Sequence, residues 1–431
     1  MSTAALLARA RLAARPQLTG SVVGAMGLTL TVEGVVAAVG DLVEVGAGLL
    51  AEVVAVTRDR LTCMPLGEIS GVHAGAPVRA TGMPLQVPVG EALLGRVLDG
   101  LGRPVDGHGP LGAVAWVDLA SETPHALSRR RVEEPLPVGV RALDTLVPVG
   151  KGQRLGIFAG SGVGKSTLLA QITRGTDADV RVIGLIGERG REVKEFLEEN
   201  LGPEGMARTV VVVATSDEPP LVRLKAAFVA TRIAEGFRDQ GRDVLLLMDS
   251  ITRTAMAQRE VGLSAGEPPA TRGYPPSVFA MMPRLLEKAG PGATGSITGL
   301  YTVLVEGDDH NEPIADTARS ILDGHVVLTR KLATAGHFPA IDVLESISRV
   351  AGAVTTRARM ADTREMRRLM GALRDVRELV EIGAYQAGSD PLVDRARMLS
   401  PAIDAFLRQA LEDTTSADDA WSMLHRLVTA G

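Results

Sequence analysis

Residues 154–175 read RLGIFAGSGVGKSTLLAQITRG. This stretch joins an apolar run typical of a buried strand to a glycine-rich loop and then to a run with helical periodicity. The loop satisfies the phosphate-loop pattern G-x-x-x-x-G-K-[ST], except that Ala159 stands in the first place. The alternative is a glycine-rich turn that binds nothing, but the flanking strand and helix favour nucleotide binding.

The chemistry of the loop follows from its residue types. Its glycines allow a tight turn that points successive N–H groups at phosphate oxygens, and the following helix directs its positive dipole end at the same anion. Lys165 can then reach the β- and γ-phosphates, and the Ser166 hydroxyl can bind Mg²⁺. The residues predicted to bind nucleotide here are Ala159, Gly160, Ser161, Gly162, Val163, Gly164, Lys165, Ser166 and Thr167.

Further apolar runs of strand length follow this stretch. They are RVIGLIG at 181–187, TVVVVAT at 209–215, DVLLLMD at 243–249, SITGLYTVLV at 296–305 and HVVLTR at 325–330. Near-continuous apolar runs suit a parallel sheet that helices cover on both faces. The sequence therefore predicts an α/β nucleotide-binding domain over residues 131–356.

The flanking regions differ from this domain in residue composition and in hydrophobic periodicity. Residues 17–82 carry short β-branched runs separated by glycine, which predict a small antiparallel barrel. Residues 83–130 are rich in Pro and Gly and indicate an ordered connector, whereas residues 357–431 have helical periodicity. Residues 1–16 contain a short amphipathic run, at 2–14, that is either a frayed terminus or a partner-binding helix.

Composition narrows the classes of protein. The chain has 431 residues, 45% hydrophobic and 23% charged, which is an ordinary globular composition with room for two or three domains. Its net charge of −5 gives no electrostatic reason to bind nucleic acid. The one cysteine, Cys63, excludes an internal disulfide, and no run approaches the roughly 20 apolar residues of a spanning helix. We therefore expect a cytoplasmic protein that reaches a membrane only through partners.

Two acidic residues are candidates for the chemistry of the site. Asp249 ends a buried strand, where it can hold Mg²⁺ through water, although it could also cap the next helix. Glu188 lies just past another strand end and is the best candidate to orient and deprotonate an attacking water, with Arg189 beside it to meet phosphate charge. The alternative is that Glu188 and Arg189 are polar residues at a helix start.

Arg349 is a weaker candidate from spacing alone. It stands at the end of a predicted loop, HFPAIDVLESIS, far along the chain. An arginine supplied across a subunit boundary would stabilise transition-state charge on the γ-phosphate. Without further information Arg349 is one arginine among many.

Several motifs together resemble one family. They are PAIDVLESIS at 339–348, GRVLDGLGRPVDG at 95–107, GERGREVKEF at 187–196 and DGHVVLTR at 323–330. This set is similar to the rotary and protein-export ATPases related to the ATP synthase β subunit. The alanine that opens the phosphate loop looks like the export branch, and residues 306–350 and 382–396 are most similar to the flagellum-specific export ATPases. The virulence type III secretion ATPases are near relatives that the sequence does not separate.

The resemblance implies a fold and a set of residue roles. The fold is a RecA-like P-loop core with an N-terminal barrel and a C-terminal helical domain. Lys165 and Ser166 match the phosphate and Mg²⁺ ligands, Glu188 the catalytic base, Arg189 a phosphate-side arginine and Asp249 the Mg²⁺-side acid. Arg349 matches the finger arginine donated to the neighbouring subunit. Phe338 and Tyr385 match two aromatics that sandwich the adenine of ATP, although core packing is the alternative for both.

The resemblance also implies partners. Family members form homohexamers, with the barrel as a crown and the helical part facing the secretion apparatus, and a stator-like regulator binds their N-terminal helix. The loop at 261–276 would lie near the central pore. We therefore expect ATP hydrolysis that energises export of flagellar proteins through the flagellar type III secretion apparatus, with the export gate, chaperones and exported proteins as partners. A rotary synthase subunit, a nucleic-acid motor and a non-catalytic ring subunit are the alternatives.

Overall fold

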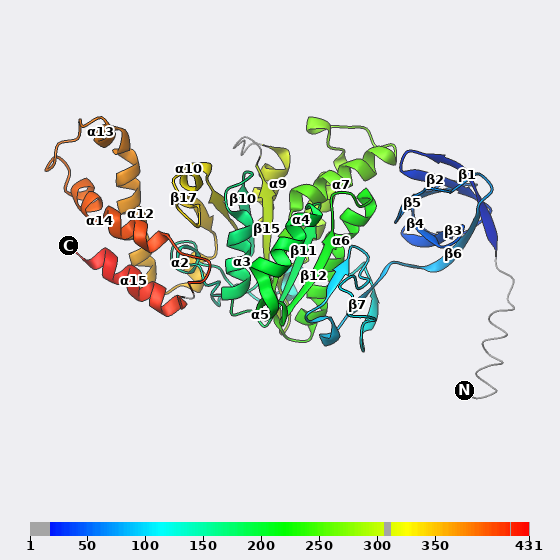
Figure 1. The fold of residues 1–431 in the computed structure, drawn as a ribbon, viewed down its shortest axis with the longest axis horizontal. Helices are drawn as coiled ribbons and strands as arrows, with labels where there is room; N and C mark the ends of the chain where they lie inside the picture. Colours follow the sequence, from blue (N-terminus) through cyan, green and yellow to red (C-terminus); the bar gives the residue numbers. More distant parts are fainter. Residues whose placement is uncertain (1–17, 306–311, 414, 431) are drawn as a thin grey trace.

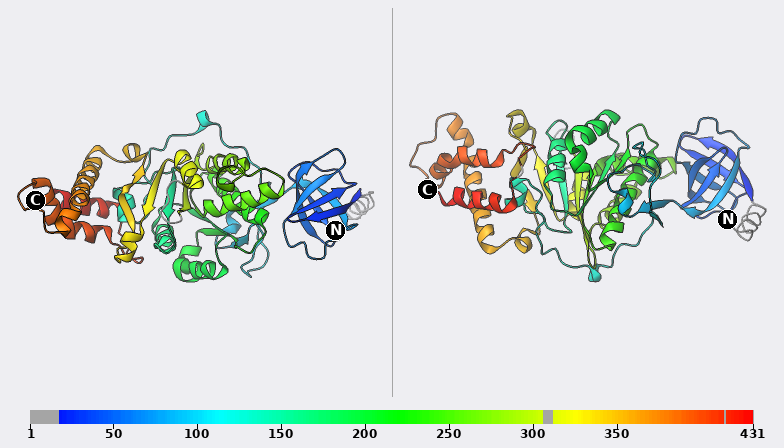
Figure 2. Two further views of the ribbon diagram at one scale, coloured as in Figure 1. Left: turned by 90° about the horizontal axis from the view of Figure 1, so that it is seen from above. Right: turned by 60° about the horizontal axis from the view of Figure 1, so that its bottom comes forward.

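The computed structural model describes residues 18–305, 312–413 and 415–430. Three parts follow one another along the long axis: a barrel, a central α/β domain and a C-terminal group of helices (Figures 1 and 2). This architecture confirms the predicted fold class. The helix predicted within residues 1–16 lies outside the described residues.

The barrel is closed by six antiparallel strands in the order β1-β2-β5-β4-β3-β6. Alternating side chains of these strands fill its interior, and the Cys63 thiol is buried there, as expected for a small apolar residue. Burial raises the pKa of this thiol to about 11. The strands are β1 (Thr19–Met26), β2 (Thr29–Glu33), β3 (Asp41–Val45), β4 (Leu49–Val56), β5 (Leu61–Pro65) and β6 (Pro77–Pro84).

The central sheet has the order β17-β16-β10-β15-β13-β11-β12-β8, and β14 (Gly290–Pro291) pairs with β15. All the predicted apolar runs are strands of this sheet, and their pairings with one another are parallel. The strands are β8 (Val97–Asp99), β10 (Arg154–Ala159), β11 (Val180–Ile186), β12 (Thr209–Ala214), β13 (Asp243–Asp249), β15 (Ser296–Leu304), β16 (Gly324–Leu328) and β17 (Ile341–Ser348).

Helices cover both faces of the sheet, which explains the continuous apolar runs. On β13, Val244, Leu246 and Met248 pack in one core with α6 to α9, whereas Leu245 and Leu247 pack in a second core with α2 and α3. The helices are α2 (Arg141–Thr145), α3 (Lys165–Gly175), α4 (Gly190–Glu195), α5 (Gly202–Met206), α6 (Pro220–Asp239), α7 (Ile251–Ser264), α8 (Pro276–Leu286), α9 (Pro313–Ile321), α10 (Arg330–Thr334) and α11 (Ala351–Val354).

Two segments differ from the sequence expectation. Residues 83–130, expected only as a connector, contribute β8, which pairs in parallel with β12; β7 (Gln86–Val89) and β9 (Ala115–Asp118) form a separate ribbon. The predicted loop before Arg349 is instead the strand β17, antiparallel to β16. Its buried apolar residues alternate with more exposed ones because it is an edge strand, so it lacks the continuous apolar run of a central strand.

The C-terminal part is helical, as predicted, with α12 (Arg357–Asp375), α13 (Arg377–Glu381), α14 (Pro391–Leu407) and α15 (Ala417–Thr429). Among the described residues, no helix is long and apolar enough to cross a membrane.

Candidate active site

The carboxyl ends of three parallel strands bring three charged side chains together. Lys165 opens α3 after β10, Glu188 follows β11, and Asp249 ends β13. The Lys165 Nζ lies 2.5 Å from Oδ1 of Asp249 and 3.6 Å from Oε1 of Glu188. The strand order therefore gathers one cation and two carboxylates at the edge of the sheet where α/β proteins bind ligands.

The phosphate loop has the backbone that its glycines predict. Gly162 and Gly164 have φ values of 75° and 84°, a region that favours glycine. Val163 is buried beneath the loop, while Ser166 and Thr167 are exposed in the first turn of α3. The loop and the helix N-terminus thus present N–H groups and hydroxyls on one accessible side, as an anion site requires.

Glu188 is fixed by its backbone. Gly187 turns the chain with a φ of 71°, its N–H donates to the Ala214 carbonyl, and the Ser216 N–H donates to the Glu188 carbonyl. A side chain at Gly187 would meet Arg253, since an added Cβ would lie 2.9 Å from the Arg253 Cβ. The turn therefore holds the Glu188 carboxylate near Lys165.

The electrostatics of the cluster suit proton transfer. Burial raises the pKa of Glu188 to about 7, with the Asp249 charge adding to the rise and the Lys165 charge opposing it. Burial alone would lower the pKa of Lys165, but Asp249 and Glu188 outweigh it and raise that pKa. Lys165 is thus a fixed cation, whereas Glu188 titrates near neutral pH, as a general base should.

Thr302 is a member of the site that the sequence analysis missed. It lies on β15 beside β13, and its hydroxyl donates to Oδ1 of Asp249 at 2.6 Å. Asp249 is therefore held from two sides, by Lys165 and by Thr302. Thr302 is recognised as a neighbour of Asp249 only when the order of strands in the sheet is known, and the sequence does not state that order.

The oxygen donors fit Mg²⁺. The Ser166 hydroxyl and the Asp249 carboxylate are hard ligands of the kind that Mg²⁺ prefers. Among the described residues, no group of three or more His, Cys, Asp or Glu could hold a metal. Mg²⁺ sites at phosphates use one or two protein oxygens together with water and substrate phosphates.

Two arginines flank the cluster differently. The Arg189 side chain is 79% exposed, and its Nη1 lies 3.4 Å from Glu192 Oε1. Arg253, on α7, packs its stem against Gly187, and within the described part of the chain its buried Nε has no hydrogen-bond partner. Arg253, which the sequence analysis missed, is therefore a cation near Glu188 with unused hydrogen-bonding capacity.

A pocket of about 280 Å³ adjoins the phosphate loop. Phe338 forms one side and is 43% exposed, and an added Cβ at Gly164 would lie 3.0 Å from its ring. The lining residues are Gly164, Thr167, Leu168, Gln171, Phe338, Pro339, Gln409, Ala410 and Leu411. The pocket thus places an exposed aromatic ring and apolar side chains next to the phosphate loop.

Tyr385, the second aromatic of the predicted sandwich, lies between α13 and α14. It does not line the pocket beside Phe338. Its hydroxyl donates to the Asp390 carbonyl and to Asp394, and Arg397 covers its ring. The wall facing Phe338 comes from the segment after α14, so this pocket does not itself support a sandwich of Phe338 and Tyr385, which stays a prediction.

Arg141 holds that wall in place. Its side chain is buried, and its guanidinium donates to the Phe406 and Arg408 carbonyls and to Asp413 Oδ2. The Arg141 N–H donates to the Gln409 side chain, while the Gln409 N–H donates to the Phe338 carbonyl. Gln409 thus joins the two sides of the pocket directly, and Arg141 on α2 fixes the side that carries Gln409.

Arg349 lies at the amino ends of the parallel strands, opposite the carboxyl ends that carry the phosphate loop. Because β17 runs antiparallel to β16, its last residue, Ser348, pairs with Gly324 at the start of β16. The eight residues of β17 span roughly 25 Å. The exposed Arg349 side chain is therefore separated from the phosphate loop of its own chain by about the length of a strand.

Family models match most of the chain. The ATP synthase alpha/beta family nucleotide-binding domain matches residues 139–348, and the beta-barrel domain of that family matches residues 22–82. The C-terminal domain of the type III secretion ATPase EscN matches residues 355–426.

Known relatives match at full length. A "Flagellum-specific ATP synthase" of Pseudomonas aeruginosa is 49% identical over 97% of this chain and 95% of that protein. A "Type 3 secretion system ATPase" of Xanthomonas euvesicatoria is 50% identical over 94% of this chain and 93% of that protein. The assembled EscN ATPase of enteropathogenic E. coli superposes with a TM-score of 0.91 at 45% identity, covering 95% of this chain and 100% of that one. EscN has also been solved with its central stalk EscO, and that structure has a TM-score of 0.90 and 44% identity over 95% of this chain and 100% of that one.

Proposed function

Because the chain belongs to the ATP synthase alpha/beta family, as an ATPase of its type III secretion and flagellar export branch, we propose that it hydrolyses ATP at Lys165, Glu188 and Asp249 to energise flagellar protein export. The observation that carries the proposal is the meeting of these three side chains beside the phosphate loop. A cation for the phosphates and a carboxylate that titrates near pH 7 are what in-line hydrolysis needs.

Each residue has a defined task in this reaction. The loop N–H groups hold the phosphates, and Lys165 neutralises charge on the β- and γ-phosphates. Glu188 accepts the proton of the water that attacks phosphorus, while the bond to the leaving phosphate oxygen breaks. Arg189 turns toward the γ-phosphate from its exposed position. The adenine of ATP lies in the pocket beside Phe338.

Ser166 and Asp249 would hold Mg²⁺, the latter through water. When bound, the ion supplies additional charge neutralisation on the phosphate oxygens. Thr302 keeps the Asp249 carboxylate oriented for this task through its hydrogen bond.

The site becomes complete only in a ring. Arg349 is exposed and lies at the far edge of its own sheet, so it suits the neighbouring chain's γ-phosphate better than its own. One chain that carries both halves of the site on opposite edges generates a closed heterologous ring. We take this ring to be a homohexamer and the loop 261–276 to face its pore.

The partners follow from the same assignment. The central stalk solved with EscN supports a stalk-type partner for this ring as well. We assign residues 1–16 to a stator-like regulator and the C-terminal helices to the export gate. Exported flagellar proteins are the cargo, and their chaperones are further partners. The ring would then act in the cytoplasm at the inner face of the membrane, held there by partners.

The test is genetic. The gene is deleted in its native host and restored either as wild type or as Glu188→Gln, and motility and secreted flagellin are scored together. Rescue of both by wild type and of neither by the variant supports the proposal. Motility that never depends on the gene removes the flagellar assignment.

The second candidate is the ATPase of a virulence secretion system. Relatives of that kind match at similar identity, 50% for the Xanthomonas protein against 49% for the Pseudomonas flagellar protein. Loss of a secreted effector in the deletion strain, with motility intact, would favour it. Co-purification with a second homologous subunit would instead favour a rotary synthase.

A further inference from the structure

We propose that Gln153 is a positioning residue that sets Arg349 for the neighbouring chain's site; this inference rests on the ring arrangement proposed above. Gln153 immediately precedes β10, the strand whose other end carries the phosphate loop. It is fully buried, and it contacts the corner of the sheet where β17 ends and Arg349 begins.

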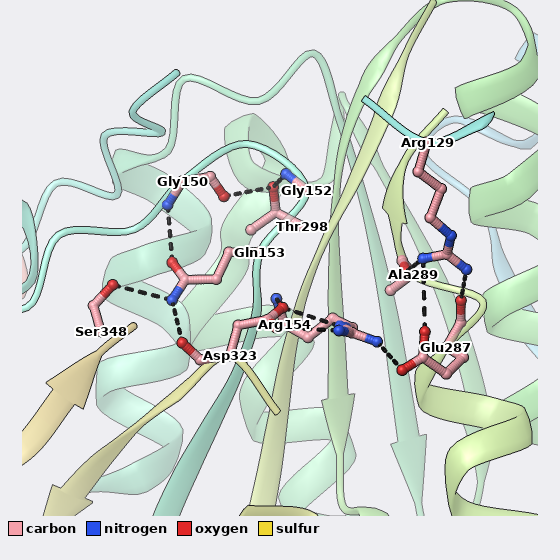
Figure 3. Close-up of polar contacts among 10 residues, drawn as sticks. All are labelled: Arg129, Gly150, Gly152, Gln153, Arg154, Glu287, Ala289, Thr298, Asp323 and Ser348. Atoms are coloured by element: carbon pink, nitrogen blue, oxygen red, sulfur yellow. Dashed lines mark hydrogen bonds and ion pairs between the residues drawn. The ribbon is translucent and has the colours of Figure 1, made fainter. Parts of the chain in front are cut away.

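Every polar group of the Gln153 side chain is used in this corner (Figure 3). Its Oε1 accepts the Gly150 N–H at 2.9 Å. Its Nε2 donates to the Asp323 carbonyl and to the Ser348 hydroxyl, both at 3.1 Å. A buried amide that donates both to the residue before β16 and to the last residue of β17 fixes the distance between these two points.

The same Asp323 carbonyl holds Arg349 directly. It accepts the Arg349 N–H at 2.9 Å as well as the Gln153 amide. The Asp323 carboxylate is held in turn by Arg154, whose Nε and Nη2 lie 3.0 and 3.1 Å from its two oxygens. Residues 153 and 154 together therefore define where the backbone of Arg349 leaves the sheet.

The backbones of β16 and β17 pack tightly against each other at this corner. Gly324, which follows Asp323, has a φ of 152°, and an added Cβ would lie 2.4 Å from the Ile347 carbonyl oxygen. The end of β17 thus lies directly against the start of β16. A finger arginine is worth orders of magnitude in rate, and a displacement of about 1 Å can cost up to a hundredfold, so this fixed corner has a direct consequence for the neighbouring site.

Gln153→Glu is the most selective change. It keeps the size of the side chain and the Oε1 acceptor, and it replaces the donating amide by an oxygen that faces the Asp323 carbonyl. Ser348→Ala is a milder second variant, which removes one of the two links. Thr298→Val is the matched control, because the buried Thr298 hydroxyl accepts the Gly152 N–H at 2.8 Å in the same corner without touching β17.

The test uses full-length chains in mixed rings. An acceptor chain, Arg349→Ala, has an intact site but gives no finger; a donor chain, Glu188→Gln, gives a finger but has no base. Mixed in equal amounts, they recover ATPase activity at roughly one site in four, where an acceptor site adjoins a donor chain. Gln153→Glu is then added to the donor or to the acceptor.

We expect the recovered kcat to fall about tenfold when Gln153→Glu is on the donor and to change less than twofold when it is on the acceptor. Ser348→Ala on the donor gives a smaller fall, and Thr298→Val on the donor gives none. The ATP affinity and the thermal unfolding midpoint of the Gln153→Glu donor are measured separately. Both must differ from the wild-type values by no more than those of the Thr298→Val donor do. If Gln153→Glu fails to fold, Ser348→Ala on donor and acceptor decides alone.

Equal losses on donor and acceptor, or no loss on either, would overturn the role of Gln153 while leaving the ring intact. Mixed rings that recover no activity at all would instead overturn the donation of Arg349 between chains, and the role of Gln153 with it. The two failures are therefore distinguishable.

Discussion

The Nζ of Lys165 lies 3.6 Å from Oε1 of Glu188, although the two residues leave different strands of the sheet. We predict that Glu188→Gln keeps this geometry and the affinity for ATP, because the amide fills the same space, yet lowers kcat by about a hundredfold or more because it cannot accept the proton of water. Steady-state ATPase assays and calorimetric binding of a non-hydrolysable ATP analogue check it. Turnover near the wild-type rate would remove Glu188 from the role of base.

The pH dependence of the reaction follows from the same carboxylate. Burial raises the pKa of Glu188 to about 7, so the free enzyme loses its base as the pH falls through that value. We predict that kcat/KM rises with pH along a limb with an apparent pKa near 7 and then levels off. Measurement from about pH 5 to about pH 9 at constant ionic strength checks it, and a profile already flat at pH 6 contradicts it.

The base pocket gives a test that separates Phe338 from Tyr385. We predict that Phe338→Ala raises the KM for ATP about tenfold, because stacking of a base on an aromatic ring contributes about 1–3 kcal/mol. Tyr385→Ala leaves the KM unchanged, since Tyr385 does not line this pocket. A KM for the Tyr385 variant that rises as much as that of Phe338→Ala would mean that the tyrosine reaches a nucleotide in some other way.

Local pattern explains what was predictable from the sequence. The phosphate loop is encoded in consecutive residues, and Glu188 and Asp249 follow apolar runs whose parallel arrangement forces their ends to one edge. The three domains were predictable for the same reason, because each has a composition and a hydrophobic periodicity that extend over many neighbouring residues.

The missed features depend on segments that are distant along the chain. The pocket wall at 409–411 is bonded to Phe338 through the Gln409 N–H, and Arg141, far away in the sequence, holds that wall. Tyr385 was assigned by resemblance to the family, which does not state this packing. The strand β17 alternates as an edge strand does, and its pairing with β16, rather than its composition, places Arg349 at the far edge.

An ion pair in the connector is expected to contribute to stability. Arg96 donates to Asp106 at 2.7 and 2.9 Å, and the two side chains are 12% and 5% exposed. We predict that Asp106→Asn lowers the free energy of unfolding by about 2 kcal/mol. Glu33→Gln, in the exposed Arg60–Glu33 pair, is the control and should cost less than about 1 kcal/mol.

The pH dependence of that stability has a defined sign. The hydrogen bond from Arg96 holds the pKa of Asp106 well below its usual range. The contribution is therefore complete above the unfolded pKa of about 3.9 and is lost as the pH falls below it. Urea unfolding at about pH 7 and about pH 3 checks this, and a difference between wild type and Asp106→Asn that persists undiminished at the lower pH contradicts it.

Arg141 gives the last prediction, since it fixes the pocket wall without facing the phosphates. We predict that Arg141→Ala raises the KM for ATP about tenfold and changes kcat less than twofold, because the segment 409–411 loses its clamp while Lys165 and Glu188 keep their places. Arg129→Ala is the matched control: Arg129 also donates to backbone carbonyls, of Ala289 and Glu287, but away from the pocket, so it should lower stability and leave the KM unchanged. If both variants raise the KM equally, the effect is general loosening of the fold and the assignment of Arg141 to the base pocket is wrong.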